Sequence, residues 1–78
     1  MMTHKQQEVL DNIIHSVQKK FPDVQLISTS ELTANSYWIT ITEPFDEDKE
    51  LEMVELLGEF STDVLMDYGF DFQFVPVS

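Results

Sequence analysis

Four polar side chains near the N-terminus are of the types that bind metal ions. His4, Glu8, Asp11 and His15 recur at helical intervals, so in a helix they form one line along its surface. Imidazole and carboxylate groups ligate zinc at roughly 2 Å. Eleven residues at a rise of about 1.5 Å place His4 and His15 about 16 Å apart, too far for one ion. We therefore expect a solvated surface with no metal or other cofactor; the alternative is a weak or intersubunit site at a neighbouring pair such as Asp11 and His15.

A second line of carboxylates lies in the helix that we expect over residues 46–68. It consists of Glu52, Glu55, Glu59 and Asp63, opposite the apolar residues of that helix. Paired carboxylates act as general acid and base when burial raises the pKa of one of them. Nothing in the sequence predicts burial on this side. We expect a solvated acidic face, and the alternative is a docking face for a basic partner.

Side chains for nucleophilic catalysis and loops for phosphate binding are missing from the sequence. There is no cysteine, and none of the serines lies in a Gly-x-Ser-x-Gly turn. The two glycines, Gly58 and Gly69, are too few and too far apart for a glycine-rich phosphate loop. We therefore do not expect an enzyme.

The charge of the chain is strongly negative and unevenly distributed. Four lysines and no arginine stand against fifteen acidic residues, a net charge of −11 at pH 7. Residues 1–22 are slightly basic, so the acidity belongs to residues 23–78. Such a chain repels nucleic-acid phosphates and anionic membranes, and it lacks the guanidinium groups that bind phosphate in a bidentate way. We expect no nucleic-acid partner.

The apolar pattern indicates a protein of the cytoplasm. No apolar run approaches the roughly 18 residues that a membrane span needs. Residues 1–20 contain charged side chains throughout, unlike a signal peptide. Together with the lack of cysteine, this predicts a cytoplasmic protein that does not bind membranes.

Two helices are predicted from apolar residues at helical spacing. The first covers residues 3–20, with Thr3 as its N-cap and Pro22 just beyond its end. The second covers residues 46–68, with Gly69 as a left-handed C-cap and a kink or break at Gly58 and Ser61 as a possibility. Its inner side is expected to comprise Val54, Leu57, Val64 and Tyr68, flanked by Met53, Phe60 and Leu65.

Three strands are predicted over residues 23–29, 36–42 and 70–76, and residues 30–35 are expected to form a polar connection. Pro76 cannot donate a hydrogen bond, so the last strand should lie at a sheet edge. The second helix joins the last two strands by a right-handed crossover, which makes them parallel.

The length of 78 residues fits one domain, residues 1–78. The predicted fold class is α+β, an α-β-β-α-β two-layer sandwich. It has a three-stranded mixed sheet of order 1-2-3 and two helices on one face. Ile39, Leu57, Val64 and Phe72 should then be nearly fully buried.

The segment SYWITIT, residues 36–42, has one apolar and one mixed face. Tyr37, Ile39 and Ile41 should face the helices, so Trp38 and Thr40 should face the uncovered side of the sheet. We predict an interface on that side, made by Trp38, Thr40, Gln73, Val75 and Ile27. The alternative is that Trp38 is shielded by its own neighbours or by the 30–35 connection.

Two functions agree with these features. The first is a small acidic protein-interaction module that self-associates, as a homodimer, through the uncovered sheet face or an edge strand. The second is an acidic inhibitor, such as a nucleic-acid mimic, immunity protein or antitoxin, that occupies a basic site on a target protein. Rising salt weakens a charge-driven complex but not an apolar one, so salt dependence separates the two.

Overall fold

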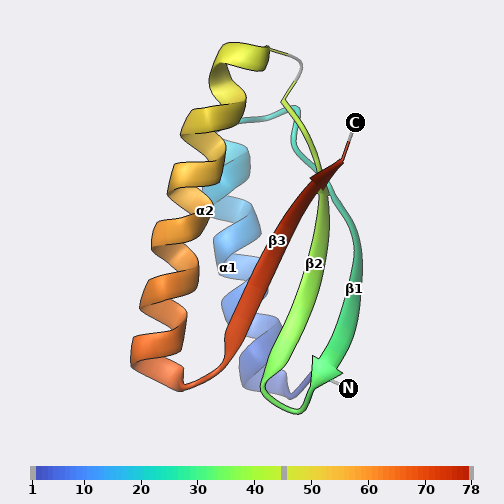
Figure 1. Cartoon of the computed structure of the whole chain (residues 1–78), viewed down its shortest axis with the longest axis vertical. Helices are drawn as coiled ribbons and strands as arrows, with labels where there is room; N and C mark the ends of the chain where they lie inside the picture. Colours follow the sequence, from blue (N-terminus) through green and yellow to red (C-terminus); the bar gives the residue numbers. More distant parts are fainter. Residues whose placement is uncertain (1, 45, 78) are drawn as a thin grey trace.

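The computed structural model describes residues 2–44 and 46–77. The elements follow the order α1 (His4–Lys20), β1 (Leu26–Thr33), β2 (Ser36–Thr42), α2 (Glu47–Tyr68) and β3 (Asp71–Val77), as Figure 1 shows. The sheet order is β1-β2-β3, with β1 antiparallel and β3 parallel to β2. The predicted α-β-β-α-β sandwich with a mixed sheet is confirmed.

Helix α1 begins and ends where the sequence predicts. The Thr3 hydroxyl accepts a hydrogen bond of 3.1 Å from the Gln6 N–H, and the Gln6 side chain accepts one of 2.9 Å from the Thr3 N–H. This capping box satisfies two N–H groups that a helix start leaves without partners. Pro22 follows the C-cap Phe21, whose N–H donates to the Val17 carbonyl.

Helix α2 is continuous from Glu47 to Tyr68, so Gly58 and Ser61 do not break it. Asp46 caps its start by accepting a hydrogen bond of 3.0 Å from the Asp48 N–H. Gly69 ends it at φ 77°, a left-handed conformation that glycine adopts without steric cost.

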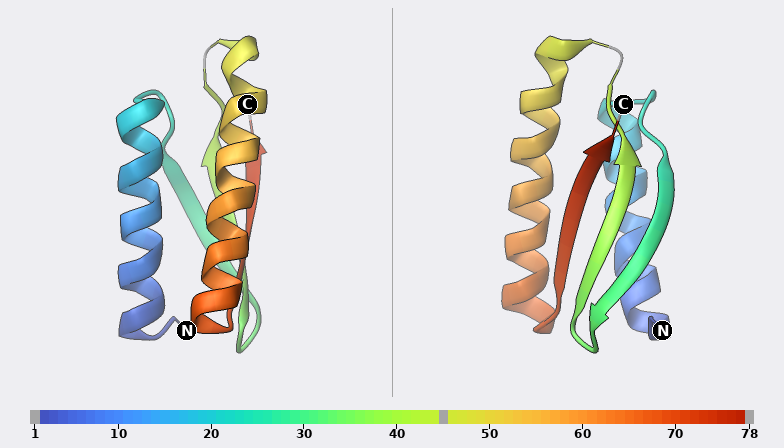
Figure 2. Two further views of the ribbon diagram at one scale, coloured as in Figure 1. Left: turned by 90° about the vertical axis from the view of Figure 1, so that its left-hand side faces the viewer. Right: turned by 45° about the vertical axis from the view of Figure 1, so that its right-hand side comes forward.

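The predicted inner side of α2 is partly wrong. The buried residues are Met53, Leu57 and Val64, whereas Val54, Leu65 and Tyr68 are exposed. Figures 1 and 2 show the reason: α1 lies behind the sheet, while α2 runs alongside the β3 edge. A helix beside a sheet edge buries a narrower strip than one over the middle of a sheet.

The first strand differs from its prediction. It begins at Leu26 rather than residue 23 and continues to Thr33, so only Ala34 and Asn35 connect it to β2. Pairing with β2 keeps the polar residues extended, including Glu31 opposite Tyr37. All eight residues of β1 are exposed. The last strand is shifted by one residue from the predicted 70–76.

The core lies between the sheet and the two helices. Ile39, Leu57, Val64 and Phe72 are 0, 3, 5 and 1% exposed, which confirms their predicted burial. Tyr37 and Ile41 of β2 are buried beside them, at 2 and 0%. The opposite face of the sheet has no helix over it in any of the three ribbon views.

Candidate protein-binding surfaces

The uncovered side of the sheet carries Trp38 at its centre. Tyr37 and Ile39 point into the core, so Trp38 between them points outward, and it is 49% exposed. The register places Ser30 of β1 and Gln73 of β3 on either side of Trp38. Ser28 and Val75 flank Thr40 in the same way. We call these six side chains the outer sheet face: Ser28, Ser30, Trp38, Thr40, Gln73 and Val75.

Four of the five predicted interface residues therefore lie together. The fifth, Ile27, is 53% exposed but lies at an irregularity of register between Leu26 and Ser28. Ser30, which sequence reasoning assigned to a loop, takes the place beside Trp38 on β1. The longer β1 accounts for this difference.

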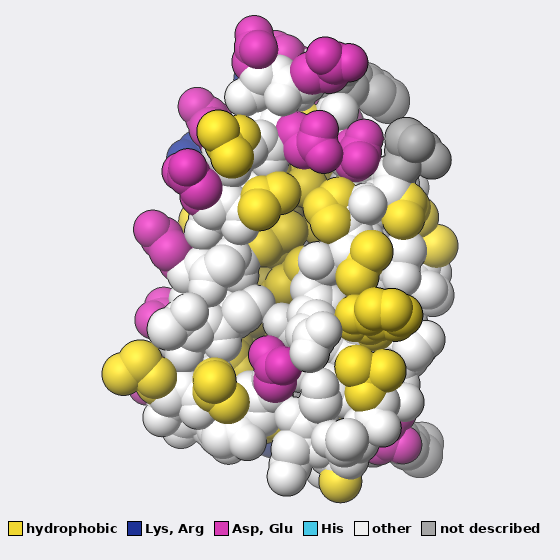
Figure 3. All heavy atoms as spheres, viewed as in Figure 1, with side chains coloured by type: hydrophobic (Ala, Val, Ile, Leu, Met, Phe, Trp, Pro, Cys, Tyr) yellow, Lys and Arg dark blue, Asp and Glu magenta, His cyan; other side chains and the backbone are white. Residues whose placement is uncertain are grey.

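All six members of the outer sheet face are uncharged. Figure 3 looks onto this side and shows apolar side chains over the strands, with most acidic side chains over α2 and near the ends of the molecule. The neighbouring Asp71 accepts a hydrogen bond of 3.1 Å from the Gln73 side chain. On a chain of charge −11, this face is a region where another molecule meets little negative charge.

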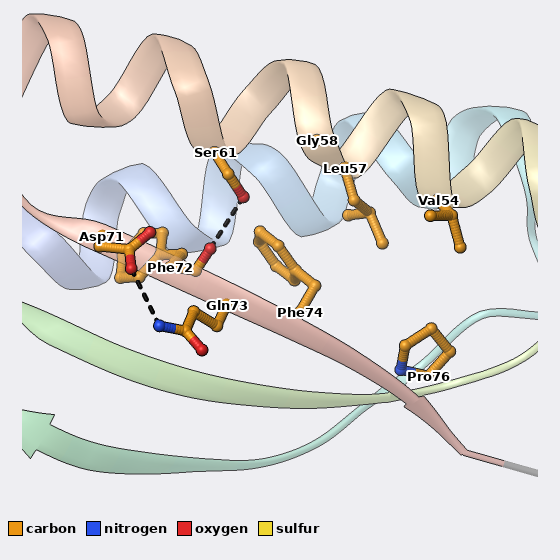
Figure 4. Close-up of a pocket in the computed structure, with 9 residues that line it drawn as sticks. All are labelled: Val54, Leu57, Gly58, Ser61, Asp71, Phe72, Gln73, Phe74 and Pro76. Atoms are coloured by element: carbon orange, nitrogen blue, oxygen red, sulfur yellow. Dashed lines mark hydrogen bonds between the residues drawn. The ribbon is translucent and has the colours of Figure 1, made fainter.

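A second surface, which sequence reasoning missed, is a groove of about 330 Å³ between α2 and β3. Its walls come from Val54, Leu57, Gly58 and Ser61 of α2 and from residues 71–74 and 76 of β3. Figure 4 shows helix and strand close together at Ser61 and Phe72 and farther apart towards Val54 and Pro76. A hollow with apolar side chains at its base is visible along the same line in Figure 3.

The groove exposes one edge of the β3 backbone. The Asp71 N–H donates to the Asn35 carbonyl and the Val77 carbonyl accepts from the Glu43 N–H, so odd-numbered residues of β3 bond towards β2. Successive residues in a parallel strand direct their backbone groups to opposite sides, so Phe72, Phe74 and Pro76 direct theirs into the groove. The Ser61 hydroxyl donates a hydrogen bond of 2.8 Å to the Phe72 carbonyl. This confirms that Pro76 lies in an edge strand.

Three carboxylates lie beyond the wide end of the groove, outside its lining. Glu47, Glu50, Val54 and Leu57 follow one another at helical spacing along α2, so both glutamates lie on the groove side of the helix. Glu43 lies opposite them, just after β2. Desolvation raises the pKa of the Glu43 carboxyl, and the charges of Glu50 and then Glu47 raise it further.

The predicted acidic face is present on the outside of α2. Glu52, Glu55, Glu59 and Asp63 are all exposed. Glu55, Glu59 and Asp63 line one shallow hollow together with Gly58. Gly58 also lines the groove, so the acidic face and the groove are adjacent.

The N-terminal line of possible metal ligands stays spread along α1. His4, Glu8, Asp11 and His15 are exposed, and Asp11 accepts a hydrogen bond of 2.9 Å from the Gln7 side chain. Within residues 2–44 and 46–77, no three His, Asp or Glu side chains come together in an arrangement that could hold a metal ion.

Comparison with protein-family models, curated proteins and solved structures finds no significant match. None of the helices in the described part of the chain has the length and apolar character needed to cross a membrane. The two surfaces above are therefore interpreted from their own chemistry.

One sequence signal could have pointed to the groove. Gly58 and Ser61 put two small residues three positions apart on the helix that precedes a strand with phenylalanines and Pro76. Small residues on a helix allow close approach or leave space beside it. Which of these occurs depends on the angle between helix and strand, and that angle is not encoded by local spacing.

Proposed function

We propose that this chain is a small, non-catalytic protein-interaction module that forms homodimers through the outer sheet face. The observation that carries the proposal is the half-exposed Trp38 at the centre of that uncharged face. Tryptophan combines a large apolar area with few rotatable bonds and is enriched among residues that dominate binding energy.

A second copy of the chain is the partner that fits the distribution of charge around the outer sheet face. Two molecules of charge −11 repel each other in most orientations. With the outer sheet faces together, the acidic faces of the two α2 helices lie on the outside of the pair. A two-fold axis through Trp38 would pair the same uncharged patch with itself, as in most homodimers.

The sheet edges are less suited to self-association than the face. The β1 edge is interrupted by register irregularities between Leu26 and Ser28 and between Glu31 and Thr33. Such irregularities are a common means of preventing edge-to-edge pairing. The β3 edge is flanked by α2, whose Ser61 already bonds to the strand.

The face is small, so the dimer should be weak. Three strands at about 4.8 Å spacing and seven residues at about 3.3 Å rise cover on the order of 300 Å². Stable complexes usually bury about 800 Å² per partner. We expect dissociation in the micromolar range or above, tighter at high salt because screening reduces the repulsion.

Analytical ultracentrifugation over a wide concentration range tests the proposal. The wild type should show a monomer–dimer equilibrium, and Trp38→Ala should stay folded and shift towards monomer. Leu65→Ala is the matched control, because Leu65 is 52% exposed on α2 and lies away from the face. A wild type that stays monomeric at high concentration, with the fluorescence of a fully hydrated tryptophan, would rule out the homodimer.

The acidic inhibitor is the second candidate, supported by the shared hollow of Glu55, Glu59 and Asp63. Pull-downs at low and high salt test it. A basic target should be retained at low salt, released at high salt, and lost when these three residues are replaced by their amides. A target that survives high salt, or that binds the amide variant equally, would contradict this function.

A further inference from the structure

We propose that the groove between α2 and β3 binds an extended peptide segment with basic residues at its ends, which adds to the sheet as a fourth strand beside β3. This site adjoins the outer sheet face, with which it shares Gln73, and the proposal does not depend on homodimer formation. Three properties of the groove lead to the proposal: unpaired backbone groups, an apolar wall and acidic ends.

The backbone groups of β3 provide the hydrogen bonds. The N–H and carbonyl of Phe74 and the carbonyl of Pro76 are directed into the groove, as the pairing of the odd-numbered residues requires. Among the described residues, only Ser61 bonds to this side of the strand, at Phe72. Main-chain bonds of this kind supply affinity when an extended peptide joins a sheet edge.

The walls leave space for a strand at the wide end only. The contact between Ser61 and Phe72 closes the narrow end, and helix and strand diverge from there (Figure 4). A Cβ atom built on Gly58 would meet nothing within 4 Å, so this stretch of the wall is open. An added strand lies about 4.8 Å from its neighbour, where alternate side chains would pack on Val54 and Leu57.

The charges at both ends select a basic peptide. Glu43, Glu47 and Glu50 interact with one another beyond the wide end, outside the groove lining, and Asp71 lines the narrow end. None of the residues that line the groove is a lysine. Cationic side chains would relieve the mutual repulsion of Glu43 and Glu50, whereas acidic peptides would add to it.

The probe is a blocked five-residue peptide, lysine-valine-threonine-valine-lysine. Its length of about 17 Å matches the five residues 73–77 of β3, beyond the closed narrow end, and both valines face one side of the strand. Titration followed by amide NMR should shift the Phe74 signal and slow its hydrogen exchange. The same peptide with glutamate at both ends should bind at least tenfold more weakly.

Backbone methylation separates strand pairing from simple charge attraction. Only alternate N–H groups of an added strand point towards β3. Methylating the threonine nitrogen or methylating both valine nitrogens should therefore have opposite results: one version loses binding and the other retains it. Equal binding by both methylated peptides would overturn the proposal.

Two variants of α2 form a matched pair. Val54→Lys places bulk and positive charge in the groove wall and should weaken binding at least tenfold. Leu65→Lys makes the same kind of change at a similarly exposed position outside the groove and should leave binding unchanged. Both residues are about half exposed, so both variants should fold.

Other outcomes identify other occupants or no site. One such outcome is that the peptide changes the amide chemical shifts of Glu52, Glu55 and Glu59 only, with no slowing of hydrogen exchange at Phe74. If added salt removes these changes, the peptide binds by non-specific charge attraction. Protection of Phe74 that grows with protein concentration in the absence of peptide would mean that a second copy fills the groove. Either result would overturn the proposal, and Trp38→Ala, which tests the homodimer, should bind the peptide like the wild type.

Discussion

The Tyr37 hydroxyl donates a buried hydrogen bond of 2.8 Å to the side-chain oxygen of Gln6. The same oxygen accepts the Thr3 N–H in the capping box of α1. One side-chain oxygen therefore connects the start of α1 to the central strand, although 31 positions separate the two residues. Desolvation, followed by the charge of Glu31, raises the pKa of Tyr37, so the phenol stays protonated and able to donate.

Removing either partner of this bond should destabilise the fold. Tyr37→Phe should cost about 1 kcal/mol, the usual net value of one hydrogen bond. Gln6→Ala should cost more, about 1–3 kcal/mol, because it removes part of the α1 cap as well as the nearest acceptor of the Tyr37 hydroxyl, which also lies 3.3 Å from the Ala34 carbonyl. Urea denaturation measures both. The exposed Gln7→Ala is the control, and equal stability of the Gln6 and Gln7 variants would contradict this interpretation.

Alanine substitutions should lower the free energy of unfolding more on the buried side of α2 than on its exposed side. Leu57→Ala and Phe72→Ala should each cost about 2–5 kcal/mol, because each leaves a cavity in a small core. Val54→Ala should cost less than about 1 kcal/mol, since Val54 is 46% exposed. Thermal melts can rank the three variants. A Val54→Ala variant as unstable as Leu57→Ala would mean that Val54 is buried, as the apolar spacing in the sequence predicts.

The two glycines should respond in opposite directions to alanine. Gly69→Ala should cost about 1–2 kcal/mol, because a side chain at φ 77° is strained. Gly58→Ala should stabilise the fold by up to about 1 kcal/mol, because alanine favours a helix interior and its Cβ would meet no atom. In a domain of this size, 1 kcal/mol shifts Tm by roughly 4–8 °C. Destabilisation by Gly58→Ala would indicate a close contact at that position.

The pKa of Glu43 makes stability depend on pH. Because this pKa is raised in the folded state, the folded chain binds the proton more tightly than the unfolded chain. The stabilisation that this proton gives the folded state is fully present below the ordinary pKa of glutamate, 4.5. It is lost as the pH rises through the raised pKa of Glu43. Mild acidification from neutral pH should therefore raise Tm.

Glu43→Gln should raise Tm at pH 7 and flatten the rise on acidification. Glu52→Gln removes the same charge from the outer face of α2 and is the matched control for loss of charge alone. Added salt should also raise Tm of the wild type by screening its carboxylates. A wild-type Tm that falls on mild acidification would exclude Glu43 as the source of the pH dependence. So would a Glu43→Gln variant with the same Tm as the wild type at each pH.

Local features of the sequence determined the order and the ends of most elements. Thr3 and Pro22 mark the two ends of α1, and Gly69 marks the end of α2. The alternation in residues 36–42 predicted β2 with Trp38 outward. These signals are reliable because capping, proline sterics and strand alternation act between residues close in sequence. They also sufficed to predict four of the six members of the outer sheet face: Trp38, Thr40, Gln73 and Val75.

The tertiary structure alone decided the extent of β1, the buried side of α2 and the existence of the groove. Three of the four residues 30–33 are polar and the stretch has no strong strand pattern, so only its pairing with β2 keeps it extended. Val54 and Leu57 are both apolar, and only the position of α2 beside β3 makes one exposed and the other buried. The groove depends on the distance between a helix wall and a strand edge, which packing of the whole chain sets and no local period encodes.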